Sequence, residues 1–250
     1  ALTTAATSTR GDVPDADACW LDIAGPRILF VDGIHDAARS TPGHVAISPL
    51  TLDTAHPLGV QASGATGWSI DLSAAEIVDT VQIVHVATGA ENHLPARLTL
   101  DEDAVASVVE TYVGTGWSNR STRITLGAGA KLTRAVRLLQ ASGFVSLRDE
   151  ADVGAEASLI VTVLGAGDAG TRIDGAITVS GDDAFAEYGG ALLTRKAQKQ
   201  ECALSVRHAA LNGQSKQIWR AVAADTSTAS LAARVEVARG AQKTDGVQSL

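Results

Sequence analysis

The two side chains best suited to bind a metal ion are Cys202 and His208. They are six residues apart, so on an extended strand both would lie on the same face, because side chains alternate between faces. A thiolate and an imidazole are suitable ligands for iron or for a transient cluster. A pair falls short of the usual four ligands, however, and a buried cysteine most often serves as a small apolar side chain. Packing is therefore the default interpretation, and iron or sulfur handling is the alternative.

A glycine pattern resembling a dinucleotide-binding turn follows the apolar run at 160–164. Gly165, Gly167 and Gly170 have the spacing G-x-G-x-x-G. A dinucleotide site requires a helix after these glycines, because the pyrophosphate binds at its N-terminus. Residues 171–181, TRIDGAITVSG, are β-branched and alternating instead, which predicts another strand. We therefore expect the chain to bind no nicotinamide or flavin nucleotide.

The remaining candidates for catalysis are weaker. Residues 213–217, GQSKQ, imitate a nucleophile elbow but lack its final glycine and the helix that should follow. His85 alternates with Val84 and Val86, and we expect it to face outward from its strand. The other histidines form no H-x-x-x-H or H-x-E pair. No residue pattern points to an enzyme, and no catalytic residue is assigned.

The glycine turn occurs twice. Residues 126–134, LGAGAKLTR, and 164–172, LGAGDAGTR, agree at six positions and lie 38 residues apart. Repetition of a strand, a turn and a second strand is typical of a stacked β architecture, in which each coil buries its apolar edge against its neighbours. The chain is 45% hydrophobic but only 4% aromatic, which suits a narrow interior filled by small and β-branched side chains.

Three regions follow from the pattern. Residues 1–18 are expected to form a flexible N-terminal arm, and residues 19–75 an irregular lead-in with short strands and a Val-Asp-Gly turn. From residue 76 to 250 alternation dominates, which predicts one all-β solenoid core without a second domain.

Composition excludes several classes of partner. The formal net charge of −8 and a pI near 5.2 argue against nucleic acid as a partner. The one basic cluster, Arg195, Lys196 and Lys199, is interpreted as a solvated face. No apolar run is long enough to span a membrane. Two cysteines without C-x-x-C spacing, and no signal peptide, indicate a cytoplasmic protein.

Several strings resemble the SufB/SufD family of iron–sulfur cluster assembly proteins. The most specific is AQKTDG at 241–246, within VARGAQKTDGVQS at 237–249, and VRHAALNGQSKQIWRAV at 206–222 also matches. The strings VHVATG, VETYVG and ITLGAGA follow the family pattern in order at 84–89, 109–114 and 124–130. The resemblance covers about 79–250. It is closer to SufD, because the cysteine-bearing central stretch usual in SufB is not recognisable.

The resemblance implies a right-handed parallel β-helix that acts as a non-catalytic scaffold. Family members pair with a SufB-like subunit and bind a SufC-like ABC-type ATPase, and the complex builds iron–sulfur clusters. We expect no tightly bound cofactor, only a transient iron–sulfur cluster in the partner complex.

The sequence stops at Leu250, where the family continues into a Cys-x-His-Gly segment and C-terminal helices that bind the ATPase. No residue of this chain takes over those roles. An uncovered final coil would leave an adhesive edge, so we expect a homodimer through 235–250 when the chain is alone.

An alternative is a free-standing β-solenoid binding module or polysaccharide-active enzyme. Such proteins usually display rows of Asp, Arg and aromatic side chains along one face, and that signal is not apparent here.

Overall fold

The computed structural model describes residues 17–76 and 79–250. About 62% of the chain is β-strand and 5% is helix, and the strands form a parallel β-solenoid of about seven turns. The all-β solenoid predicted from alternation and glycine-rich turns is thus confirmed. Of the expected N-terminal arm, residues 1–18, only Asp17 and Ala18 lie within the described residues.

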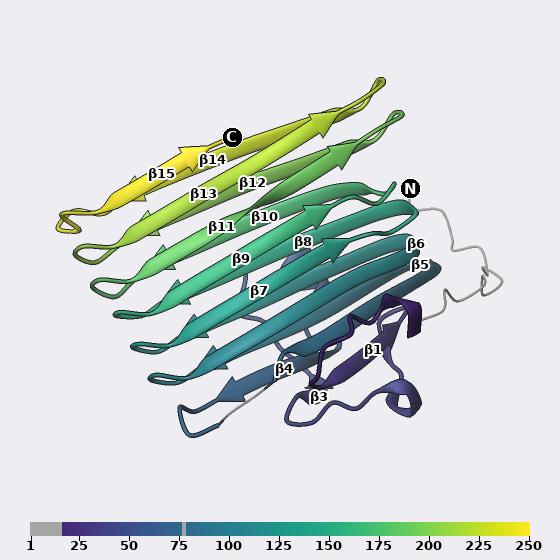
Figure 1. Ribbon diagram of the computed structural model, residues 1–250, viewed down its shortest axis with the longest axis horizontal. Coiled ribbons are helices and arrows are strands. Elements are labelled where there is room, and N and C mark those ends of the chain that lie inside the picture. The colour runs from purple at the N-terminus through teal and green to yellow at the C-terminus, as the bar shows by residue number, and fades with distance from the viewer. Residues whose placement is uncertain (1–16, 77–78) are drawn as a thin grey trace.

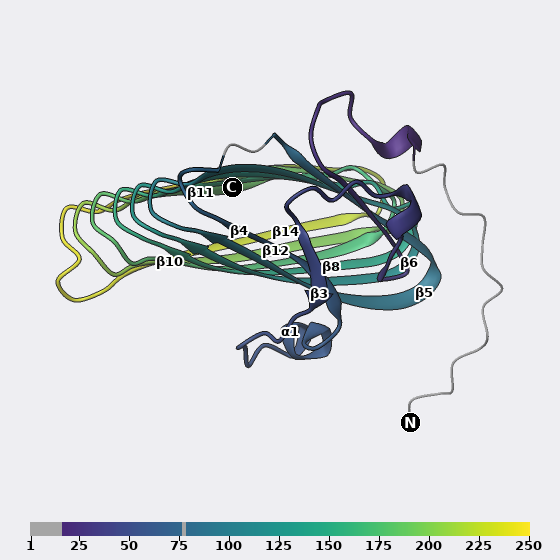
Figure 2. The same ribbon diagram turned by 90° about the horizontal axis from the view of Figure 1, so that it is seen from below.

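The strands stack as two layers that face each other across a narrow interior (Figures 1 and 2). From β7 onward, odd-numbered strands pair with one another and form the odd sheet, and even-numbered strands form the even sheet. The long strands β5 and β6 run through both sheets. In chain order the strands are β1 (Arg27–Val31), β2 (Ile34–His35), β3 (Ala46–Pro49), β4 (Thr66–Leu72), β5 (Val81–Leu100), β6 (Val105–Leu126), β7 (Lys131–Leu138), β8 (Ser142–Val153), β9 (Ser158–Gly165), β10 (Gly170–Val179), β11 (Phe185–Thr194), β12 (Lys199–His208), β13 (Gln214–Ala223), β14 (Thr228–Val237) and β15 (Asp245–Ser249).

One coil takes 26 to 31 residues, as the register of the paired strands shows, from Val105 with Lys131 to Gln214 with Asp245. The 38-residue offset between the two glycine turns is therefore not the coil repeat. The turn at 127–130 connects β6 to β7, whereas the turn at 166–169 connects β9 to β10 at the opposite edge. Both edges use Gly-Ala-Gly because both need tight turns. The two similar stretches are therefore about one and a half coils apart.

The turns that lead from the even sheet to the odd sheet share one geometry. In the turns up to β13, a residue with positive φ is followed by a small buried residue, as in Asp103 (φ 59°) before Ala104 and Glu156 (φ 56°) before Ala157. Successive turns are joined by backbone hydrogen bonds, such as the 2.8 Å bond from Asp103 N to Ala128 O. The buried alanine leaves the corner narrow, and the left-handed residue lets the chain reverse within it.

The lead-in segment contributes to the first coil. Strand β1 pairs in parallel with β5, and it turns into β2 through Asp32 and Gly33, both with positive φ, as the predicted Val-Asp-Gly turn requires. Strand β4 pairs with β5 on the even sheet. The short helix α1 (Pro57–Ala62) lies outside the even sheet (Figure 2). Two further turns of 3₁₀ helix lie at Asp17–Cys19 and Ala37–Arg39.

Within the described residues, no helix has the length and apolar character needed to cross a membrane.

Candidate functional site

The predicted pair, Cys202 and His208, lies on β12 with both side chains turned into the solenoid. The shared face expected from their spacing is therefore present. Six residues of extended strand span about 20 Å, however, so one ion could not bind both side chains. Each could act only separately.

The thiol of Cys202 belongs to the hydrophobic core and is 3% exposed. Burial, together with the nearby carboxylate of Asp174, raises the pKa of Cys202 to about 12. Because the thiolate is the form that binds metals and attacks sulfur, this side chain behaves as a small apolar residue at neutral pH.

The imidazole of His208 is fully buried at the end of β12. Its Nε2 atom lies 2.9 Å from Ser215 Oγ, whereas Nδ1 has no hydrogen-bond partner. Burial lowers the pKa of His208. The ring therefore stays neutral and packs against Gly213, where an added Cβ would lie 2.8 Å from Nδ1. No group of three or more His, Cys, Asp or Glu side chains placed to hold a metal ion occurs in 17–76 or 79–250.

The strongest concentration of chemistry lies elsewhere in the interior. Arg134 on β7 donates to Glu110 on β6 and to Asp149 on β8, both at 2.6 Å, and all three side chains are at most 2% exposed. The hydroxyl of Tyr112 donates to Glu110 at 2.8 Å, and that of Tyr188 donates to Asp149 at 2.7 Å. We call these five residues the interior network.

Within the interior network, Glu110 and Arg134 stabilise each other's charged form. Burial by itself would raise the pKa of Glu110, but the Arg134 guanidinium outweighs it and holds that pKa well below its usual range. Burial would likewise lower the pKa of Arg134, and Asp149 and Glu110 raise it instead. Glu110 and Arg134 are therefore both ionised at neutral pH, and removal of Arg134 would leave Glu110 as an unpaired charge in a low-dielectric interior.

His85 does not face outward as expected. Its side chain is 1% exposed and stacks between Phe30 and Tyr112, with ring centroids 5.6 Å and 4.6 Å away. Arg120 Nε lies 3.4 Å from Nδ1, which leaves Nε2 directed at Glu110, 3.5 Å away. Burial, with a contribution from Arg120, lowers the pKa of His85 to about 4.

The expectation for His85 failed because the first half of β5 is buried on both faces. Its other face carries Val84 and Val86, which pack with Leu29 and Val31 beneath Trp20 of the lead-in. Alternation separates inside from outside only when one face is solvated, and the lead-in covers this one.

The interior network did have a signal in the sequence. The side chains of β7 that point inward are Leu132, Arg134, Val136 and Leu138. An arginine therefore stands at a position where the alternation calls for an apolar residue. Glu110 and Asp149 occupy the same phase of β6 and β8. Charges of opposite sign at inward positions of neighbouring strands predict a buried ion network.

The glycines at 165, 167 and 170 serve packing. The segment after them is strand β10, as expected, and not a helix. An added Cβ at Gly167 would lie 2.5 Å from the carbonyl oxygen of Gln140 on the coil below. Close contact between stacked turns therefore accounts for a glycine there.

The outer face of the even sheet carries a line of ion pairs that the sequence did not reveal. The pairs are Arg97–Asp71, Arg123–Glu150, Arg148–Glu150, Arg172–Asp174, Arg172–Glu201, Arg207–Glu236 and Arg234–Glu236. Glycoside hydrolysis needs one carboxyl group held protonated, whereas an adjacent arginine favours the ionised form. This row therefore gives no support to a polysaccharide-active site.

Comparison with known proteins agrees with the architecture. A family model described as the SUF system FeS cluster assembly SufBD core domain matches residues 85–250, from β5 to the end of the chain. The chain belongs to the SufBD core family. The match spans the coils that hold the interior network, Cys202 and His208. No curated protein matched the sequence. Membership places the protein in iron–sulfur cluster assembly.

Proposed function

We propose that the protein is a SufD-like scaffold subunit of an iron–sulfur cluster assembly complex, without catalytic activity of its own. It pairs with a SufB-like subunit and a SufC-like ABC-type ATPase, and the cluster is a transient cargo of that complex. The burial of Cys202 is the observation that favours a SufD-like over a SufB-like role. A cluster-building subunit needs an accessible thiolate, whereas Cys202 is a core residue with a pKa of about 12.

Co-purification tests the proposed partners. The full-length protein, co-expressed with a SufB-like and a SufC-like protein, should elute with both in one complex. Failure to bind either partner would contradict the proposal.

A variant series separates a scaffold from a sulfur carrier. The complex carrying Cys202→Ala should build clusters, followed by their visible absorption, at the rate of the unchanged complex. Cys202→Ser, which buries a hydroxyl instead, serves as a control for packing. If both variants assemble normally but lose cluster formation, Cys202 has a direct role and the SufD-like assignment is wrong.

The homodimer expected of the isolated chain stays a prediction, and sedimentation at micromolar concentration would test it.

A further inference from the structure

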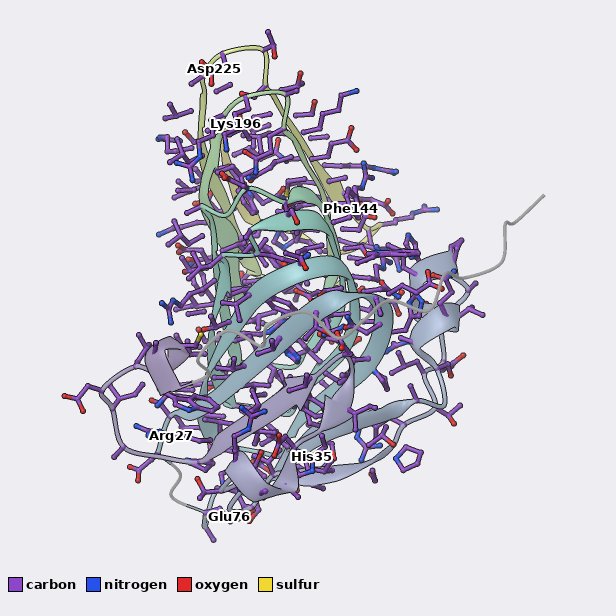
Figure 3. All side chains as sticks on the ribbon, turned by 90° about the vertical axis from the view of Figure 1, so that its right-hand side faces the viewer. Arg27, His35, Glu76, Phe144, Lys196 and Asp225 are labelled. Atoms are coloured by element: carbon purple, nitrogen blue, oxygen red, sulfur yellow. The ribbon has the colours of Figure 1, made fainter. Side chains whose placement is uncertain are left out.

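Phe144 is the one exposed Phe, Tyr or Trp side chain among the described residues, with 40% of its surface accessible. It lies at the start of β8, on the edge of the solenoid that also carries Lys196 and Asp225 (Figure 3). A shallow hollow of about 490 Å³ adjoins the ring, and Gly170, Arg195, Lys196 and Lys199 also line it. We call this hollow the Phe144 hollow.

The floor of the hollow is built by the register of three strands. Phe144 on β8 is the partner of Gly170 on β10, and Lys199 begins β12 beside Gly170. A Cβ on Gly170 would lie 3.0 Å from the Phe144 ring. The ring thus lies against the glycine backbone of the neighbouring strand, and its exposed part lines the hollow. Exposed aromatic side chains in such places are typical anchors of protein interfaces.

The wall of the hollow is positively charged. Asp168 accepts from Arg195 at 2.7 Å and from Lys196 at 3.1 Å. One carboxylate therefore neutralises only one of these two cations. Glu201, which lies on the same outer face as Lys199, is engaged by Arg172 at 3.0 Å. Even counting Asp225, whose carboxylate accepts from the Lys196 amide, the three cations of the lining outnumber the two carboxylates, on a chain whose net charge is −8.

The hollow is held in shape before any partner arrives. Gln198, 9% exposed, donates through Nε2 to the carbonyls of Gly167 and Ala169 on the coil below, at 2.7 Å and 2.9 Å. Its Oε1 accepts from the backbone N–H of Arg195 at 3.0 Å. The amide of Lys196, in the left-handed region at φ 59°, donates to Asp225 on the coil above. A preformed surface loses little conformational entropy on binding.

We propose that the Phe144 hollow is a docking site for an acidic segment of a partner protein, one that places an apolar side chain on Phe144 and carboxylates beside Lys199 and Arg195. The apolar floor favours a peptide over a small anion, because a small anion would leave the ring unused. Electrostatic attraction selects the acidic partner and speeds encounter, and the ring supplies the buried area.

A peptide titration tests the site on the full chain. The probe is a fluorescein-labelled synthetic peptide that alternates glutamate with leucine, followed by fluorescence anisotropy. Binding should saturate and should weaken as NaCl rises from about 50 to 500 mM, because salt screens exposed charges. Phe144→Ala and Lys199→Glu should each weaken it by about tenfold or more, the loss of about 1.4 kcal/mol. Lys131→Glu, an equal charge reversal at an exposed lysine on β7, should leave it unchanged.

Three results would overturn the proposal. One is the absence of saturable binding, and a second is equal weakening by Lys131→Glu, since general charge attraction would then be responsible. The third is tighter binding of a single-stranded oligonucleotide with the same dependence on Phe144, which would assign the hollow to nucleic acid. Circular dichroism of each variant should match the unchanged protein, because neither Phe144 nor Lys199 is part of the core.

Discussion

Arg134 and Glu110 form an ion pair inside the solenoid, with 2.6 Å between Nε and Oε1 and no more than 2% of either side chain exposed. The second carboxylate on Arg134, Asp149, comes from the facing sheet. The two sheets are therefore tied together through one guanidinium at the centre of the interior.

Arg134→Ala should destabilise the fold by about 3–5 kcal/mol, because it leaves two carboxylates buried without a counterion. Urea unfolding followed by circular dichroism measures the change. Arg97→Ala, which breaks a pair with Asp71 in which both side chains are nearly half exposed, should cost less than about 1 kcal/mol. If both variants lost a similar amount of unfolding free energy, the buried ion pairs of Arg134 would matter no more for stability than the exposed pair of Arg97.

His85 should make stability fall with acid. Its pKa is depressed to about 4 in the fold, so the unfolded chain, with a histidine pKa near 6.5, binds the proton more readily. The contribution is complete above about pH 6.5 and is lost as pH falls toward 4, amounting to about 3 kcal/mol. Unfolding free energies measured from pH 7 to 4 should show this slope for the unchanged protein and a shallower one for His85→Gln. Equal slopes would show that His85 does not titrate in this range.

Cys202 should resist alkylation in the native state. In a Cys19→Ser variant, a maleimide should label Cys202 only at the rate of unfolding, because the thiol is buried and its pKa is about 12. Labelling should become rapid in denaturant. Rapid reaction of the folded protein would mean that the interior opens around β12.

Gly181→Ala should destabilise the fold by about 1–3 kcal/mol, the usual cost of overpacking. A Cβ there would lie 1.9 Å from the backbone nitrogen of Ala155, and backbone cannot move aside cheaply. Gly246→Ala is the matched control, since its nearest neighbour would be 3.5 Å away. Thermal unfolding should separate the two variants clearly; equal melting temperatures would disprove tight stacking at this corner.

Alternation and turn composition predicted the solenoid and the common face of Cys202 and His208, because both depend only on local geometry. The coil length was not predictable from one pair of similar turns. Both edges use Gly-Ala-Gly, and the element that recurs at three of the even-to-odd corners is a buried alanine, Ala104, Ala157 or Ala184, after a left-handed Asp or Glu.

His85 shows the limit of local reasoning at the site. The first half of β5 is buried on both faces because the lead-in segment, some 50 residues earlier in the chain, packs on its outer face. The alternation of residues within β5 carries no information about that cover. The interior network was recognisable in principle, since Arg134 breaks an apolar phase. Its pairing with Glu110 and Asp149 also required the register of three strands.

The hydrogen bond from Tyr188 to Asp149 joins β11 to β8 and therefore passes over the coil that contains β9. Linear repeat proteins often unfold piecemeal, because each unit is coupled only to its immediate neighbours. This bond spans about one and a half coils and reaches past β9, so it adds coupling beyond adjacent strands. In hydrogen-exchange experiments the coils from β6 to β11 should open as a single cooperative block, with fraying confined to the strands beyond it.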